Sequence, residues 1–115
     1  MSLPLAKQVI SQPLAKRLKA LNVRQDSIFA WHLDGTLFQP MDMENPYIDY
    51  SAFTSSEIGE MLPGVYHPFK MDDGRYIWLR EKENDPRSYA DTETEARGLM
   101  LAYLIKTKII NVKDL

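Results

Sequence analysis

The spacing of apolar and polar residues near the start of the chain predicts an amphipathic helix over 12–21. Ser11 suits the position that caps a helix start, and Pro13 suits the first turn, where a missing N–H costs nothing. Asn22 suits the left-handed conformation in which many helices end. Apolar residues recur at helical spacing between these signals, at Leu14, Ala15, Leu18 and Leu21.

Two further helices are predicted from capping boxes, in which a hydroxyl residue is followed three positions later by a glutamate. Thr54 and Glu57 form the first such pair, and they predict a short helix over 55–62 that Pro63-Gly64 ends. Thr92 and Glu95 form the second pair. The apolar face of the last helix is expected at Ala96, Leu99, Met100, Tyr103 and Leu104.

The segments between the predicted helices have the pattern of β-hairpins. Residues 28–33 alternate between two faces and are joined to 36–38 by Asp34-Gly35, which predicts a hairpin with a two-residue turn. The second hairpin is expected at 65–71 and 75–81, with its turn at 72–74. Pro68 lies in the first arm of that hairpin and favours an edge strand, because proline cannot donate a backbone hydrogen bond.

The order helix, hairpin, helix, hairpin, helix predicts an α+β fold. We expect a single domain over 1–115, with one mostly antiparallel sheet built from two β-hairpins and three helices packed against it. A chain of 115 residues is long enough for one hydrophobic core and too short for two.

Composition points to a protein of a reducing compartment. The chain has no Cys, which excludes disulfides and thiolate metal sites, and it lacks an apolar run long enough to cross a bilayer. Its opening residues also lack the apolar run of a secretory signal. We therefore expect a cytoplasmic protein that has no contact with membranes.

Charge is distributed unevenly, although the net charge is only −2. The residues before Asp26 include bases and no acid, whereas 26–69 contains seven acids and neither Lys nor Arg. The bases could dock an acidic partner, or they could lie beside the acidic middle of the same chain, and we favour the second interpretation. A nucleic-acid-associated protein is thus the alternative rather than the expectation, and it would use the bases Lys7, Lys16, Arg17, Lys19 and Arg24.

Evidence for catalysis is weak. Residues 29–38 resemble the first motif of the haloacid-dehalogenase phosphotransferases, but His32 stands where that family has its nucleophilic aspartate, and only Asp34 matches. His32 and His67 are too few for a zinc site without added carboxylates. A small hydrolase using His32, Asp34 or His67 is therefore the weaker alternative, and no metal or cofactor is expected.

The segment from Pro40 to Phe53 is the longest without periodicity, and it is rich in acids and aromatics. Its aromatic residues either fold back to complete the core or remain exposed as a contact surface for a protein partner or a second copy of the chain. Under the second alternative, the candidate interaction residues are Asp42, Glu44, Tyr47, Tyr50 and Phe53.

Four stretches of this sequence resemble a group of small proteins from gut bacteria and their phages or prophages. These stretches are Ile10-Ser11 with 14–19, then 26–31, 54–63, and 90–97 with 100–105. The resemblance covers most of the chain, and its motifs are helix caps and helix faces. It implies an accessory protein of a phage or mobile element, with no established activity and no catalytic residue. Our leading hypothesis is a non-enzymatic interaction protein.

Overall fold

The computed structural model describes residues 5–39, 50–64, 66–79, 82 and 84–115. Its α-helices are α1 (Leu5–Gln8), α2 (Gln12–Ala20), α3 (Ser55–Met61) and α4 (Glu93–Lys106), and its 3-10 helices are η2 (Pro86–Ser88) and η3 (Val112–Asp114). The three predicted helices are confirmed, and α1 is an additional single turn. None of the described helices is long and apolar enough to cross a membrane.

The side chains that were expected to start the helices do so. Ser11, Thr54 and Thr92 are the N-caps of α2, α3 and α4, and each accepts a hydrogen bond from the backbone N–H three residues further on. Asn22 has a φ of 68°, which confirms the left-handed end of α2.

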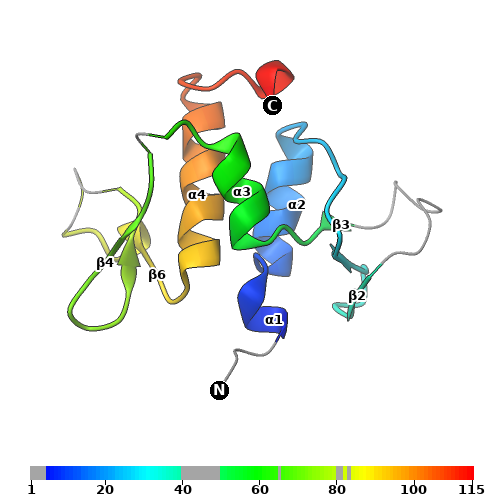
Figure 1. Cartoon of the computed structure of the whole chain (residues 1–115), viewed down its shortest axis with the longest axis horizontal. Coiled ribbons are helices and arrows are strands. Elements are labelled where there is room, and N and C mark those ends of the chain that lie inside the picture. The colour runs from blue at the N-terminus through cyan, green and yellow to red at the C-terminus, as the bar shows by residue number, and fades with distance from the viewer. Residues whose placement is uncertain (1–4, 40–49, 65, 80–81, 83) are drawn as a thin grey trace.

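Helices α2, α3 and α4 lie side by side and run in the same direction, from bottom to top in Figure 1. Ser11 at the start of α2 contacts Glu95 in the first turn of α4, and Leu14 lies against Gly98 one turn further along. Arg97 of α4 likewise reaches Ser55 at the start of α3. The three N-termini therefore meet at one end of the molecule.

The hydrophobic core lies between these helices, with α4 in contact with α2, α3 and both strands β5 and β6. Leu101 and Ile105 are buried, as expected for a helix covered on more than one side. Leu99 and Tyr103, which belong to the predicted apolar face of this helix, are half-buried and pack against the edge of the core. The most deeply buried large side chains are Phe53, Ile10, Leu18, Ile58, Ile77 and Leu101.

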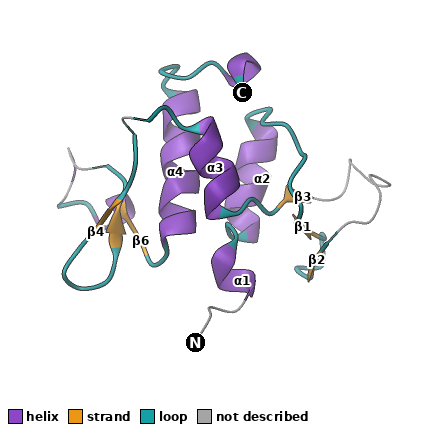
Figure 2. Ribbon diagram, viewed as in Figure 1, coloured by secondary structure: helices purple, strands orange, loops and turns teal. Residues whose placement is uncertain are grey.

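The α+β class and both hairpins are confirmed, but the hairpins do not join into one sheet. β1 (Ala30–Trp31), β2 (Leu37–Phe38) and β3 (Tyr50–Ser51) form one antiparallel sheet in the order β2-β1-β3. β4 (Phe69–Lys70), β5 (Tyr76–Ile77) and β6 (Tyr89–Ala90) form the other, in the order β4-β5-β6. Figure 2 shows the two sheets on opposite sides of the helices, which separate them. β4 is an edge strand, as Pro68 predicts.

The first hairpin turn is longer than predicted. The N–H of His32 donates to the carbonyl of Thr36, and the N–H of Gly35 donates to the carbonyl of His32. The loop therefore consists of three residues, 33–35, with Gly35 in the left-handed region at a φ of 89°. The second hairpin has the same arrangement at 72–74, as expected, with Gly74 at a φ of 90°.

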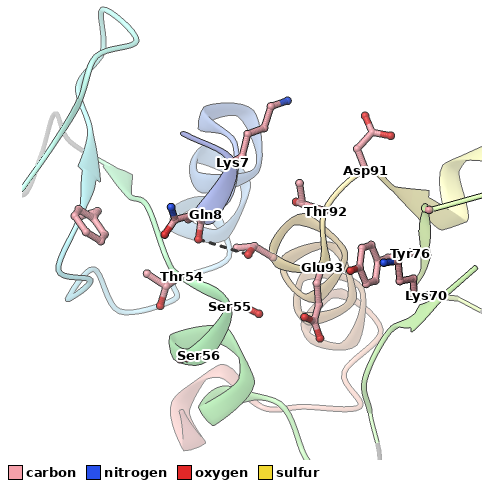
Figure 3. Close-up of a pocket in the computed structure, with 13 residues that line it drawn as sticks. Lys7, Gln8, Thr54, Ser55, Ser56, Lys70, Tyr76, Asp91, Thr92 and Glu93 are labelled. Atoms are coloured by element: carbon pink, nitrogen blue, oxygen red, sulfur yellow. Dashed lines mark hydrogen bonds between the residues drawn. The ribbon is translucent and has the colours of Figure 1, made fainter. Parts of the chain in front are cut away.

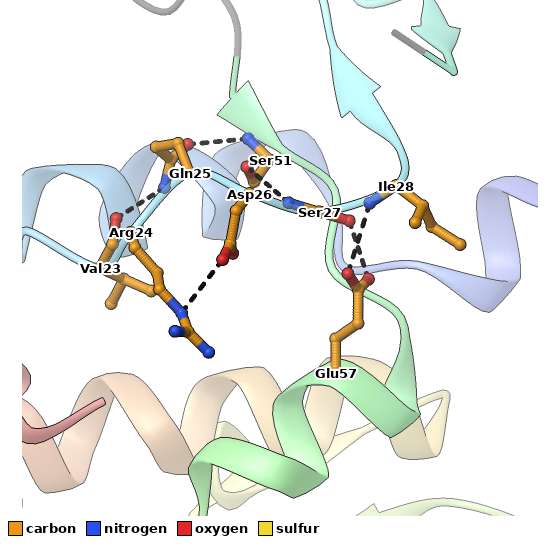
Figure 4. Close-up of polar contacts among 8 residues, drawn as sticks. All are labelled: Val23, Arg24, Gln25, Asp26, Ser27, Ile28, Ser51 and Glu57. Atoms are coloured by element: carbon orange, nitrogen blue, oxygen red, sulfur yellow. Dashed lines mark hydrogen bonds and ion pairs between the residues drawn. The ribbon is translucent and has the colours of Figure 1, made fainter. Parts of the chain in front are cut away.

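Glu57 fastens the start of α3 to the connection that leads into β1. Its carboxylate accepts hydrogen bonds from the N–H of Thr54 at 2.9 Å, the hydroxyl of Ser27 at 2.8 Å and the N–H of Ile28 at 3.3 Å. Figure 4 shows Glu57 below this connection, with Gln25 further along accepting from the N–H of Ser51 at 2.8 Å. The capping box at Thr54 is therefore confirmed, and its glutamate also binds the segment that leads into β1.

The second capping box is only half formed. The hydroxyl of Thr92 accepts from the N–H of Glu95 at 3.1 Å, but the Glu95 carboxylate turns to Ser11 instead of the Thr92 backbone. It accepts from the Ser11 N–H at 2.8 Å and from the Ser11 hydroxyl at 2.6 Å. The reason is the parallel packing of α2 and α4, which brings Ser11 within reach.

Replacing Thr92 with alanine is expected to lower the free energy of unfolding by about 1 kcal/mol, because the N–H of Glu95 loses its acceptor. Urea denaturation followed by circular dichroism measures this difference. Serine at position 92 keeps the hydroxyl and should retain most of the stability. An equal loss in the serine and alanine variants would show that the cap does not contribute as the geometry indicates.

Candidate binding groove

A groove of about 600 Å³ lies at the end of the molecule where the helix N-termini meet. Its walls come from α1, the starts of α3 and α4, the approach to β1, and the hairpin of β4 and β5 (Figure 3). The lining residues are Lys7, Gln8, Phe29, Thr54, Ser55, Ser56, Lys70, Gly74, Tyr76, Asp91, Thr92, Glu93 and Thr94. Most of them carry hydroxyl, amide or charged groups.

Contacts of the last residue of α1 and of the residue after it hold α1 over the starts of α3 and α4. Val9 pairs with Thr54 in an antiparallel bridge. The hydroxyl of Thr94 donates to the carbonyl of Gln8 at 3.5 Å, the dashed contact in Figure 3. One side of the groove is therefore built from a segment remote in sequence from α3 and α4.

Arg97 fixes the distance between α3 and α4 beneath the groove. Its Nη1 donates to the carbonyl of Ser55 at 2.9 Å, and its Nη2 pairs with the Glu93 carboxylate at 3.1 Å. The guanidinium passes so close to Gly59 that a side chain there would collide with it. The Nε atom of Arg97 is buried and has no hydrogen-bond partner among the described residues. Two groove residues, Ser55 and Glu93, are thus held by one side chain.

The charged groups of the groove come from different elements. Lys7 on α1 and Lys70 on β4 are both exposed, and in the part of the chain that the structure describes neither forms an ion pair. Asp91 is exposed as well, whereas Glu93 is paired with Arg97. In Figure 3, Lys70 lies beside Tyr76 on the hairpin wall, while Lys7 and Asp91 lie at the upper rim.

The candidate interaction residues of segment 40–53 have different positions. Phe53 is only 1% exposed and belongs to the core, so its assignment to a contact surface is corrected. Tyr50 is half-buried against the core, and the ammonium groups of Lys16 and Lys19 lie 5.8 and 5.2 Å from its ring centre. The other three candidates, Asp42, Glu44 and Tyr47, lie outside the described residues.

The bases of the N-terminal part have different surroundings. Lys7 lines the groove, whereas Lys16 and Lys19 lie over the ring of Tyr50. Arg24 pairs with Asp26 at 3.2 Å. Some of the bases therefore contact residues from the acid-rich segment 26–69 of their own chain.

The residues of the hydrolase hypothesis are divided between the two sides of the molecule. His32 stacks on Phe38 in the first hairpin, with ring centres 3.7 Å apart, whereas His67 lies two residues before Phe69, the first residue of β4 in the other sheet, and contacts its ring. Asp34 accepts hydrogen bonds from the hydroxyl and the N–H of Thr36, and these bonds hold the pKa of its carboxyl below the usual value. No group of three His, Cys, Asp or Glu residues that could hold a metal occurs within the described ranges.

Comparison with known proteins assigns neither a family nor a function to this chain. Scans of protein-family models, curated proteins and solved structures found no match to this chain. The groove is therefore interpreted from its own residues. Sequence reasoning identified Thr54 and Thr92 as caps and Lys7 only as one base of the nucleic-acid alternative, and it missed Lys70 and Tyr76 as members of a site. No local pattern connects these positions, because only the parallel packing of the helices brings their segments together.

Proposed function

We propose that this protein acts by binding a partner protein, and that the groove receives a short segment of that partner. The observation that carries the proposal is the convergence of five chain segments around one hollow whose polar side chains have different chemical characters. A volume of about 600 Å³ lies within the range of pockets that bind ligands. The mixture of charges, hydroxyls and the aromatic residues Phe29 and Tyr76 suits a peptide.

The surroundings of the groove favour recognition through side chains over the addition of a strand to the sheet. β4 is the sheet edge beside the groove, and Pro68 directly before it has no N–H to offer to an added strand. β4 itself is only two residues long. A partner segment would therefore gain most of its affinity from contacts with Lys70, Tyr76 and the starts of α3 and α4.

An interaction protein also agrees with the accessory role that the resemblance to small phage and bacterial proteins implies. The nucleic-acid alternative has less support, because the bases on which it relies are divided between the groove, Tyr50 and Asp26. The hydrolase alternative would need His32 and His67 to act from separate sheets.

The test is a selection of random short peptides displayed on phage against the immobilised protein. We expect selected peptides to bind with micromolar affinity and to shift the backbone amide signals of Ser55, Ser56, Lys70 and Glu93 in NMR spectra. Changing Ser56, which is exposed in the groove, to tryptophan should fill the space and weaken binding at least tenfold.

The matched control is Glu60→Trp, which introduces the same bulk at an exposed position of the same helix outside the groove. This variant should bind the selected peptides as the unmodified protein does. Peptides whose signals map to another surface, or a selection that enriches none, would contradict the proposal.

A further inference from the structure

We propose that the partner segment that occupies the groove is acidic. This inference rests on the proposed function and specifies its ligand. Lys7 and Lys70 approach the groove from α1 and β4 without an ion-pair partner in the described parts of the chain. Glu93 is neutralised by Arg97, which leaves Asp91 as the one lining acid without a described ion pair. The lining groups without a described ion pair therefore carry a net positive charge, although the whole chain has a net charge of −2.

The hydrogen-bonding groups of the groove point to the same chemistry. Lysine ammonium groups only donate, and a carboxylate only accepts. The hydroxyls of Ser55 and Ser56 have no hydrogen-bond partner among the described residues, so both can donate to a ligand. Acidic side chains of a bound segment can thus accept from the ammonium groups and from the hydroxyls, whereas a basic side chain would find Asp91 as the only lining carboxylate without a described ion pair.

Because the two lysines lie in the groove, binding there can be distinguished from general attraction between opposite charges. Lys7 and Lys70 belong to segments far apart in the sequence, and Figure 3 shows them on different walls of the groove. Lys106 and Lys108 are equally exposed, but they lie at the opposite end of α4, where the helix C-terminus is. These two lysines provide a control of identical charge.

The experiment measures binding of fluorescein-labelled hexaglutamate and hexalysine by anisotropy at about 0.15 M salt, where the Debye length is about 8 Å. We expect the protein to bind hexaglutamate and not hexalysine. The double variant Lys7→Glu with Lys70→Glu should weaken hexaglutamate binding about tenfold, as expected for the loss of two exposed ion pairs and the gain of repulsion. The control Lys106→Glu with Lys108→Glu has the same net charge and should change affinity by less than about twofold, because these charges are distant and screened.

Equal weakening by both double variants, or equal binding of hexalysine, would overturn the inference. Failure of the inference and failure of the proposed function can be distinguished by the displayed peptides. If peptides without acidic residues shift the amide signals of Ser55 and Glu93 while hexaglutamate does not bind, the groove binds a partner that is not acidic. If neither kind of peptide shifts these signals, both proposals fail.

Discussion

Replacing Gly98 with alanine is expected to lower the free energy of unfolding by about 2 kcal/mol, although alanine is the better helix former by about 1 kcal/mol. A Cβ atom at this position would lie 2.6 Å from Cδ2 of Leu14 and 2.9 Å from Cγ2 of Ile10. Leu14 is 2% exposed and Ile10 is fully buried, so neither side chain has open space into which it can move. The collision therefore separates α2 from α4.

Urea denaturation of the Gly98 variant measures this effect, and Gly64→Ala is the matched control. Gly64 is exposed and has no atom within 4 Å of an added Cβ, so its replacement should change stability by less than about 0.5 kcal/mol. Combining Gly98→Ala with Leu14→Ala should cost less than the sum of the single changes, because the smaller side chain removes one of the collisions. A Gly98 variant as stable as the original protein would show that α2 and α4 are less tightly packed than the structure indicates.

The second large effect is expected for Glu57→Ala, with a loss of about 3 kcal/mol. The change removes the acceptor of three hydrogen bonds, from the N–H of Thr54, the hydroxyl of Ser27 and the N–H of Ile28. Hydrogen bonds to a charged group contribute more than neutral ones, and two of the three, from Ser27 and Ile28, connect α3 to a segment distant in the sequence. We expect the loss in chemical denaturation, together with faster amide exchange at residues 27–31.

Glu60→Ala is the control for this prediction, because Glu60 is exposed on the same helix and its side chain makes no hydrogen bond within the described part of the chain. Its replacement should change stability by less than about 0.5 kcal/mol. A loss of similar size in both variants would show that the hydrogen bonds of Glu57 do not account for its effect.

Local signals in the sequence were sufficient to predict where the helices begin. Ser11, Thr54 and Thr92 cap their helices because a hydroxyl satisfies a neighbouring N–H wherever the helix lies in the fold. The positions of the hairpins were also predicted, since Gly35 and Gly74 supply the left-handed conformation that their turns require.

Features that depend on the arrangement of helices were not predictable in this way. The two hairpins were expected in one sheet, but nothing in their sequences shows that three helices separate them. Glu95 was expected to complete a capping box, and its preference for Ser11 depends on α2 lying beside α4. The groove depends on the same arrangement, because Lys7 and Lys70 line one hollow only in the folded chain.

The parallel course of α2, α3 and α4 also determines how the chain can fold. Parallel neighbours cannot be joined by a short turn, and long connections accordingly separate α2 from α3 (residues 21–54) and α3 from α4 (residues 62–92). Each helix contact therefore requires closure of a long loop before any packing energy is gained. Contacts between helices so far apart in the sequence raise the contact order above that of a bundle joined by short turns, and the molecule should fold correspondingly slowly for its helical core.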